Sequence, residues 1–441
     1  MPQHPLWRKQ MLRTPAILTN LLIVLVTTAT IADDWPQWRG PSRDGVWRET
    51  GIIDQFPSEQ LALSWRVPIS SGYSGPTVAA GRVYVTDRLV EPRQVERILC
   101  FDAQSGTMLW SHEYDCEYSI SYEAGPRASV SVDHGVAYAL GAMGHLHSLD
   151  AKTGKVLWKK DLNADYKIRM PIWGIAASPL IYDDHIILQI GGSGNSCIIA
   201  LDKKTGAERW SALDDRACYS APILVQQNSH DVVVCWTGDS VAGIDPSQGK
   251  VHWRIPWAPR NMPIGISTPI VKGNQVFMTS FYDGSLMLKL SETDLTAKKE
   301  WQRVGRDEKN TDALQSIIST PLFVEDHLYG VDSYGELRCL DPDSGDRIWE
   351  DQTATPRARW SNIHFVTNAN RVWMFNEVGE LIIATLSPQG FHEISRAQLI
   401  DPTLAQLRQR NGVCWAHPAF ANRHIFVRND KELVCANLAS E

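Results

Sequence analysis

A quartet of residues recurs eight times along the chain, and its first member is often a side chain that can contact a ligand. The second and third members are small or polar, and the fourth is usually proline. The quartets begin at Tyr73, Arg127, Ala176, Tyr219, Ile266, Ile318, Trp360 and Trp415. Aromatic rings stack on flat or extended ligands, and arginine pairs with anionic groups. The candidate binding residues are Tyr73, Arg127, Tyr219, Trp360 and Trp415, with Trp173, Arg359, Asn362 and His417 beside them.

These eight first positions include no carboxylate. A calcium ion in a protein takes six to eight oxygen ligands, many of them carboxylates, so the set does not resemble a calcium site. Three acidic residues lie in loops that could still bring carboxylates to the point where the quartets converge: Glu117, Glu123 and Asp312. No catalytic role is assigned to them. In a second interpretation, which we favour, the aromatic side chains only pack together and fill the channel on which the quartets converge.

His145 and His147 are two residues apart, which places both side chains on one face of a strand, as metal ligands require. A single pair is weak evidence for a metal site, and we favour the interpretation that both histidines are ordinary polar residues of a strand. The sequence shows no Ser-His-Asp arrangement in a recognisable context, no phosphate-binding loop and no dinucleotide motif. The catalytic residues therefore stay unassigned, and no metal site is predicted.

The composition indicates a soluble globular protein: 43% of the 441 residues are hydrophobic and 21% are charged. The formal net charge is −7 and the Lys and Arg residues are scattered, whereas nucleic-acid binding needs a concentrated basic surface. We therefore expect no nucleic-acid partner. The 17 tryptophans are unusual and need a structural explanation first.

The N-terminus has the pattern of a signal peptide. Arg8, Lys9 and Arg13 precede an apolar stretch over 16–26, and small residues follow at Thr30 and Ala32. We expect a signal peptide over 1–32, cleaved after Ala32, and a protein exported to the periplasm or cell envelope with no stable transmembrane span. The alternative is an uncleaved anchor, although the apolar stretch is short for a bilayer span.

Eight cysteines show no CxxC or vicinal pair, so disulfide connectivity cannot be assigned from their spacing. Cys100 and Cys339 each stand two residues before an aspartate at matching positions of a repeat. That placement suggests small buried hydrophobic residues with free thiols.

One repeat organises the chain: an aspartate is followed by glycine four residues later and by tryptophan eight residues later. It begins at Asp102, Asp150, Asp202, Asp245 and Asp341. The aspartate starts a tight turn, the glycine takes the left-handed position, and the next residues form a strand that ends in tryptophan. The tryptophans that mark successive units are Trp65, Trp110, Trp158, Trp210, Trp253, Trp301 and Trp349. Their spacing suits one four-stranded propeller blade per unit.

The units add up to an eight-bladed, all-β propeller over 61–441, preceded by an N-terminal arm over 33–60. A degenerate unit keeps only the turn at 387–390, and 413–438 supplies about three further strands. Pairing these with the strand at 61–65 completes an eighth antiparallel blade and removes exposed sheet edges. Seven blades, with one unit misassigned, is the alternative. Only 401–411 has the pattern of a short capped helix.

The repeat resembles that of the pyrroloquinoline quinone (PQQ)-like propeller superfamily, and the resemblance covers nearly all of the predicted mature chain. It implies that the seven tryptophans dock neighbouring blades and are structural. The segment 35–45 is similar to the lead-in of exported proteins with this repeat, which implies an arm lying against the ring. The four long loops at 111–128, 159–175, 302–317 and 395–414 are where specificity would reside.

Two branches of the superfamily imply different functions. Quinoprotein alcohol dehydrogenases hold PQQ and calcium at the ring mouth, usually with a vicinal cysteine disulfide that this chain lacks. The BamB-like branch consists of non-enzymatic propellers of similar size, although BamB is normally lipidated and this chain has no cysteine near the expected cleavage site. We expect a monomeric ring that acts as a binding or scaffold protein for an envelope protein or glycan and needs no cofactor. The alternatives are a PQQ- and calcium-dependent oxidoreductase with atypical ligands and a carbohydrate-binding propeller.

Overall fold

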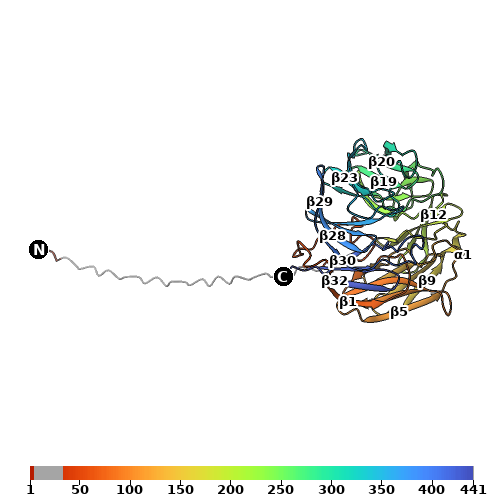
Figure 1. Cartoon of the computed structure of the whole chain (residues 1–441), viewed down its shortest axis with the longest axis horizontal. Coiled ribbons are helices and arrows are strands. Elements are labelled where there is room, and N and C mark those ends of the chain that lie inside the picture. The colour runs from red at the N-terminus through yellow and green to blue at the C-terminus, as the bar shows by residue number, and fades with distance from the viewer. Residues whose placement is uncertain (4–32, 441) are drawn as a thin grey trace. The chain divides into compact units, whose positions relative to one another are not determined.

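The computed structural model describes residues 1–3 and 33–440, so the predicted signal peptide falls almost entirely outside the described residues. Residues 33–440 form eight antiparallel sheets of four strands each, arranged as the blades of a propeller (Figure 1). The predicted eight-bladed architecture is confirmed, and the seven-bladed alternative is wrong. No helix in the described part of the chain is long and apolar enough to cross a membrane.

Each blade runs from a short strand near the ring axis to a strand at the rim. The strands nearest the axis are β2 (Thr77–Ala79), β6 (Ser131–Asp133), β10 (Leu180–Tyr182), β14 (Ile223–Gln227), β18 (Ile270–Lys272), β22 (Leu322–Val324), β26 (Ile363–Asn368) and β30 (Ala419–Ala421). The second strands are β3 (Arg82–Leu89), β7 (Val136–Leu140), β11 (His185–Gly192), β15 (His230–Trp236), β19 (Gln275–Ser280), β23 (His327–Val331), β27 (Arg371–Asn376) and β31 (His424–Arg428).

The third strands are almost fully buried between neighbouring blades. Along the rim strands, side chains that are partly buried alternate with side chains that are exposed to solvent. The third strands are β4 (Val95–Asp102), β8 (His145–Asp150), β12 (Ser196–Asp202), β16 (Ser240–Ile244), β20 (Gly284–Leu290), β24 (Leu337–Leu340), β28 (Glu380–Ser387) and β32 (Glu432–Asn437). The rim strands are β5 (Met108–Asp115), β9 (Val156–Asp161), β13 (Glu208–Ala212), β17 (Val251–Pro256), β21 (Ala297–Arg303), β25 (Arg347–Asp351), β29 (Gly390–Gln398) and β1 (Leu63–Pro68).

The Asp–Gly–Trp repeat builds the turn between the third strand and the rim strand. In the first blade the Asp102 carboxylate accepts a hydrogen bond from the Ser105 amide, and the Gly106 amide donates to the Asp102 carbonyl. Gly106 has φ +71°, which L-residues with a side chain rarely adopt. The same aspartate and glycine contacts recur around Asp150 and Asp202.

The repeat tryptophans join each blade to the next one. The Trp158 ring lies on Gly206 of the following turn, where an added Cβ would come within 2.9 Å of the ring. The indole nitrogen of Trp158 also donates to the Lys203 carbonyl at 3.1 Å. Equivalent indole hydrogen bonds to the next turn are made by Trp65, Trp110, Trp210, Trp301 and Trp349.

Trp253 is the exception, because the turn that follows it is irregular. Its indole nitrogen donates to the Gln227 side chain at 3.0 Å, and the amide nitrogen of Gln227 donates to the Thr296 carbonyl at 2.6 Å. Gln227 therefore connects Trp253 to the irregular turn of the next blade.

The ring closes through the two ends of the described chain. Strand β1 pairs with β32 in the antiparallel order β1-β32-β31-β30, and Figure 1 shows the orange β1 beside the blue β32. Because of this pairing, the last blade contains strands from both ends, as the sequence predicted.

The expected helix at 401–411 is wrong. Residues 401–411 form turns and one bridge between Thr403 and Val413, not a helix, because Asp430 accepts hydrogen bonds from this segment and ties it to the last blade. The one helix described in 33–440 is instead α1 (Leu162–Tyr166), capped by Asp161.

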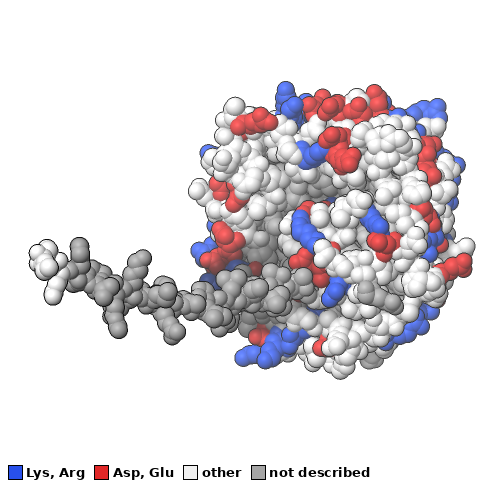
Figure 2. All heavy atoms as spheres, turned by 90° about the vertical axis from the view of Figure 1, so that its left-hand side faces the viewer, with Lys and Arg blue, Asp and Glu red and all other residues white. Residues whose placement is uncertain are grey.

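All eight cysteines are buried with free thiols. On the face seen in Figure 2, acidic and basic residues are interspersed.

Candidate binding cavity

A cavity of about 150 Å³ lies on the ring axis, and its wall is mainly aromatic. All eight first members of the recurring quartets line it: Tyr73, Arg127, Ala176, Tyr219, Ile266, Ile318, Trp360 and Trp415. Its other lining residues are Trp38, Tyr122, Trp173, Ser178, Ala221, Ile317, His364 and His417. The candidate residues are thus brought together, with Arg359 and Asn362 outside the lining.

The quartets reach the axis because they come immediately before the strands nearest to it. Seven of the eight quartets end before the strand begins, and the quartet at 360–363 overlaps the first residue of β26. Their polar middle residues bond neighbouring blades instead of continuing the sheets. Ser220 donates to the Ser267 carbonyl at 2.9 Å, and Ser129 donates to the Gly75 carbonyl at 3.0 Å. These bonds hold the cavity wall on a rigid scaffold.

The N-terminal arm contributes one side of this wall. Its Trp35 pairs with Val78 next to the axis in the first blade, and Trp47 donates its amide to the Thr367 carbonyl in the seventh. Between them Trp38 enters the cavity lining, donates to the Thr268 hydroxyl at 2.8 Å and lies 5.0 Å from the His417 ring. The arm therefore does more than lie against the ring, because it spans blades and closes part of the channel.

Arg127 is a cation in the wall without a carboxylate partner among the described residues. Its guanidinium donates to the main-chain carbonyls of Gly125, Ser121 and Tyr122, and it lies 4.9 Å from the centre of the Tyr73 ring. Tyr73 is fixed in turn, because its hydroxyl donates to the Gln406 carbonyl at 3.0 Å. The positive charge of Arg127 is thus available to an anionic group.

Trp360 combines backbone strain with an unused hydrogen-bond donor. Its φ is +69°, an unusual value for a bulky residue, and its buried indole nitrogen has no hydrogen-bond partner. Arg359 lies 4.3 Å from the ring centre, but Glu308 holds its guanidinium through two bonds of 2.7 and 2.6 Å. Arg359 therefore positions Trp360 and is itself neutralised. It also holds the pKa of Glu308 below its usual range.

Tyr122 and Trp173 line the cavity in contact with Trp360 and Tyr219, respectively. Tyr122 also has a positive φ, +57°, and its ring meets those of Trp173 and Trp360 edge to face. Trp173 packs on Tyr219 with ring centres 5.1 Å apart, and its amide donates to the Tyr219 hydroxyl at 3.3 Å. Strained residues persist where their surroundings impose the conformation, as they do in ligand-binding sites.

Asn362 and His417 have partners within the protein. The Asn362 side chain accepts from the Ser319 hydroxyl at 2.8 Å and contacts the His364 ring nitrogen at 3.0 Å. His364 and His417 are buried with ring centres 4.9 Å apart. Burial lowers the pKa of both imidazoles, that of His364 to about 4, so both are neutral at pH 7. Asn362 is therefore a structural link between blades.

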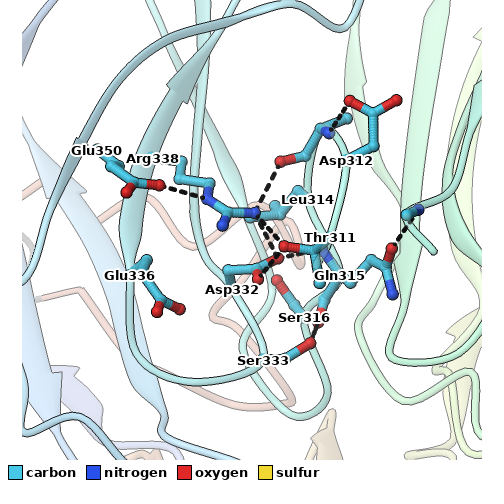
Figure 3. A network of polar contacts seen from close by, with 12 residues as sticks. Thr311, Asp312, Leu314, Gln315, Ser316, Asp332, Ser333, Glu336, Arg338 and Glu350 are labelled. Carbon is cyan, nitrogen blue, oxygen red and sulfur yellow. Dashed lines mark hydrogen bonds and ion pairs between the residues drawn. The ribbon is translucent and has the colours of Figure 1, made fainter. Parts of the chain in front are cut away.

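A buried network holds the loop that leads to Ile317 and Ile318 (Figure 3). Asp332 accepts hydrogen bonds from the Thr311 hydroxyl and the Gln315 amide, both at 2.6 Å, and pairs with Arg338 at 2.9 Å. Burial raises the pKa of the Asp332 carboxyl, against the opposing effect of the Arg338 charge. The network fixes the loop over 304–316 beside the cavity.

The other acidic and histidine candidates lie away from the lining. Glu117 is exposed, Glu123 approaches Arg88 at 3.9 Å, and Asp312 pairs with Arg303 at 2.8 Å. His147 is buried in β8, and across residues 33–440 no group of three His, Cys, Asp or Glu side chains is arranged to bind a metal ion.

Six lining residues are not among the candidates from the sequence: Trp38, Tyr122, Ser178, Ala221, Ile317 and His364. Trp38 lies in the arm, outside the recurring quartets. Tyr122 comes from a long loop whose path the sequence does not determine. His364 is one position beyond the quartet that begins at Trp360, so a five-residue unit at this position includes it.

The fold and the cavity define a PQQ-like β-propeller. The family model described as outer membrane protein assembly factor BamB matches residues 94–294 and 231–440, and the chain belongs to this family.

At low sequence identity the chain is similar both to a quinohemoprotein alcohol dehydrogenase and to BamB. The quinohemoprotein alcohol dehydrogenase ADH-IIG of Pseudomonas putida is 30% identical over 227 residues, which cover 44% of this chain and only 30% of that enzyme. The assembly factor BamB of Yersinia pestis is 23% identical over 284 residues, 62% of this chain and 67% of that protein. The crystal structure of BamB from Moraxella catarrhalis superposes with a TM-score of 0.58 at 16% identity, covering 86% of this chain and 98% of that one.

The similarity to a quinohemoprotein alcohol dehydrogenase suggests PQQ and calcium as possible ligands. The side chains that line the cavity do not fit a calcium ion. The side-chain oxygens of the lining are the hydroxyls of Ser178, Tyr73, Tyr122 and Tyr219, with no carboxylate or amide. Calcium requires six to eight oxygen ligands and favours charged ones. Arg127 would in addition repel a cation at this place.

Proposed function

We propose that this chain is an exported, non-catalytic binding propeller of the periplasm or cell envelope, which holds a segment of a partner protein in its axial cavity. The observation that carries the proposal is the cavity itself: aromatic rings surround one uncompensated arginine, without a carboxylate. Such a wall favours a side chain or chain end that is flat or apolar and carries a negative charge.

The family relationship supports a protein partner. A rigid ring with strained aromatic residues at its axis is preorganised, so that little conformational entropy is lost on binding. A glycan is the less suitable ligand, because sugar hydroxyls need many polar partners and this wall offers few. If the protein bound to a glycan array and this binding depended on Trp360, the result would favour a glycan as the ligand.

The binding proposal is tested by photo-crosslinking in cells that produce the full chain. A photoreactive phenylalanine analogue replaces Trp173 in the cavity or, as the matched control, Leu157, which is 51% exposed on rim strand β9. We expect a discrete protein adduct at position 173, loss of that adduct in Arg127→Gln, and none at 157. Absence of an adduct at 173, or an adduct indifferent to Arg127, would contradict the proposal.

The enzymatic alternative is tested separately by titrating the purified protein with PQQ and calcium. We expect neither a bound quinone absorbance nor dye-linked oxidation of alcohols or sugars. A stoichiometric quinone spectrum accompanied by oxidation would overturn the non-catalytic assignment.

A further inference from the structure

The N-terminal arm buries two arginines, Arg39 and Arg43, next to the cavity. Their exposed fractions are only 3% and 4%. Arg39 follows Trp38 of the cavity wall, and Arg43 donates to the carbonyl of Ser178, another lining residue, at 3.0 Å. Neither guanidinium forms an ion pair with a carboxylate in the described chain. Asp44, the acidic residue nearest in sequence, pairs with Arg48 at the surface.

Arg43 is largely satisfied by other groups, whereas Arg39 is not. Arg43 donates to the Pro179 carbonyl at 2.7 Å and to the Gln37 side chain at 3.1 Å, in addition to Ser178. Arg39 donates only from Nη2, to the Asp44 carbonyl at 2.9 Å. Its Nε and Nη1 are enclosed and have no partner. Arg39 thus holds three N–H donors and a positive charge in the interior without an acceptor.

The backbone of the arm is strained at both arginines. Arg39 has φ +60° and Arg43 has φ +56°, in the left-handed region that residues with a side chain seldom occupy. Gly45, beside them, is required for space, because an added Cβ would lie 2.6 Å from Nη2 of Arg39. The turn is therefore built around the guanidinium of Arg39.

An isolated buried cation is among the most unfavourable arrangements in a folded protein. A buried polar group without a partner calls for an explanation, and an ion or a water molecule bound to it is one. The Arg39 charge adds to burial in lowering the pKa of Arg43 to about 9, and the Asp44 charge only partly offsets the burial that lowers the pKa of Arg39 to about 10. Neutral water would satisfy the donors but not the charge.

We propose that a small inorganic anion of about the size of chloride binds to Nε and Nη1 of Arg39, with Arg43 supplying a second positive charge. The enclosure of both nitrogens limits the anion to a compact one that is taken up as the ring folds. This structural ion site lies in the arm, and it does not depend on what occupies the axial cavity.

The direct test is the anomalous diffraction of crystals of the wild-type protein that was purified and crystallised in bromide. We expect an anomalous peak at hydrogen-bonding distance from Arg39 Nε and Nη1. A map with bromide at surface sites but with none at Arg39, or with a water molecule there, would overturn the proposal.

A solution test uses thermal unfolding at constant ionic strength, in chloride or in gluconate, which is too large for the site. Chloride should raise the midpoint of the wild-type protein by about 2 °C or more, because a ligand that binds only the folded state stabilises it. The increment should vanish in Arg39→Gln and persist in the matched control Arg48→Gln, whose side chain is 46% exposed. An equal increment in both variants would contradict the assignment.

Discussion

His364 shows how a single buried side chain makes the stability of the ring depend on pH. Burial lowers its pKa to about 4 from the usual 6.5. Between these pH values the unfolded chain binds a proton that the folded chain excludes, so the contribution to stability is complete above pH 6.5 and is lost as the pH falls to 4. One pKa unit corresponds to about 1.4 kcal/mol, so we expect a loss of about 3 kcal/mol from this residue.

The measurement is urea unfolding of His364→Asn and of the wild-type protein at pH 7 and at pH 4.5. The variant should lose less stability between the two pH values than the wild type does. His134→Asn is the control for the substitution itself, because the His134 side chain is exposed. Equal pH dependence in the wild type and His364→Asn would show that this imidazole is protonated as readily in the folded chain.

At the scale of elements, the turn glycines have two separable roles. Gly81 and Gly206 have nearly the same φ, +72° and +71°, but only Gly206 lies under a tryptophan ring. Gly81→Ala should cost about 1–2 kcal/mol for the left-handed backbone. Gly206→Ala should cost about 1–3 kcal/mol more, because its Cβ would lie 2.9 Å from the Trp158 ring. Urea unfolding of both variants compares the costs, and equal costs would contradict the docking role of Trp158.

The buried Asp332–Arg338 pair anchors its loop through charge and hydrogen bonds together (Figure 3). Removing one partner leaves the other charge buried and unpaired, so Arg338→Met should destabilise the ring by about 3–5 kcal/mol. The double variant Asp332→Leu/Arg338→Met should cost less than Arg338→Met alone, since no isolated charge remains. Chemical unfolding measures both, and additive losses would contradict this interpretation.

The elements differ in how far the sequence determines them. The repeat forms through local interactions at a fixed spacing, as shown by Asp102, Gly106 and Trp110. The turn, the rim strand and the blade period can therefore be predicted. The recurring quartets mark the axis in the same way, and their first members line the cavity. Trp38 and Tyr122 could not be placed, because their positions depend on the path of an arm and a loop. The absence of a helix at 401–411 follows from tertiary bonds to Asp430, which local propensity does not include.

For the whole molecule, closure of the ring by β1 and β32 decides whether eight blades behave as one unit. β32 lies between β1 and β31, so its removal leaves two sheet edges unpaired. We expect the full chain, after export, to be a monomer that unfolds cooperatively, and we expect a chain ending at Lys431 to associate through these edges and lose that cooperativity.

The matched control ends at Leu438. It keeps β32 and loses the bridge between Ile52 and Ala439, the bond from the Ser440 amide to the Gly51 carbonyl and the bond from the Ala439 amide to the Asn437 side chain. Light scattering coupled to size exclusion gives the oligomeric state, and calorimetry gives the cooperativity of unfolding. The control should match the full chain in both. If the chain ending at Lys431 also remained a monomer with one sharp transition, the seven remaining complete blades would suffice for stability, and the terminal strand pair would not be what holds the ring closed.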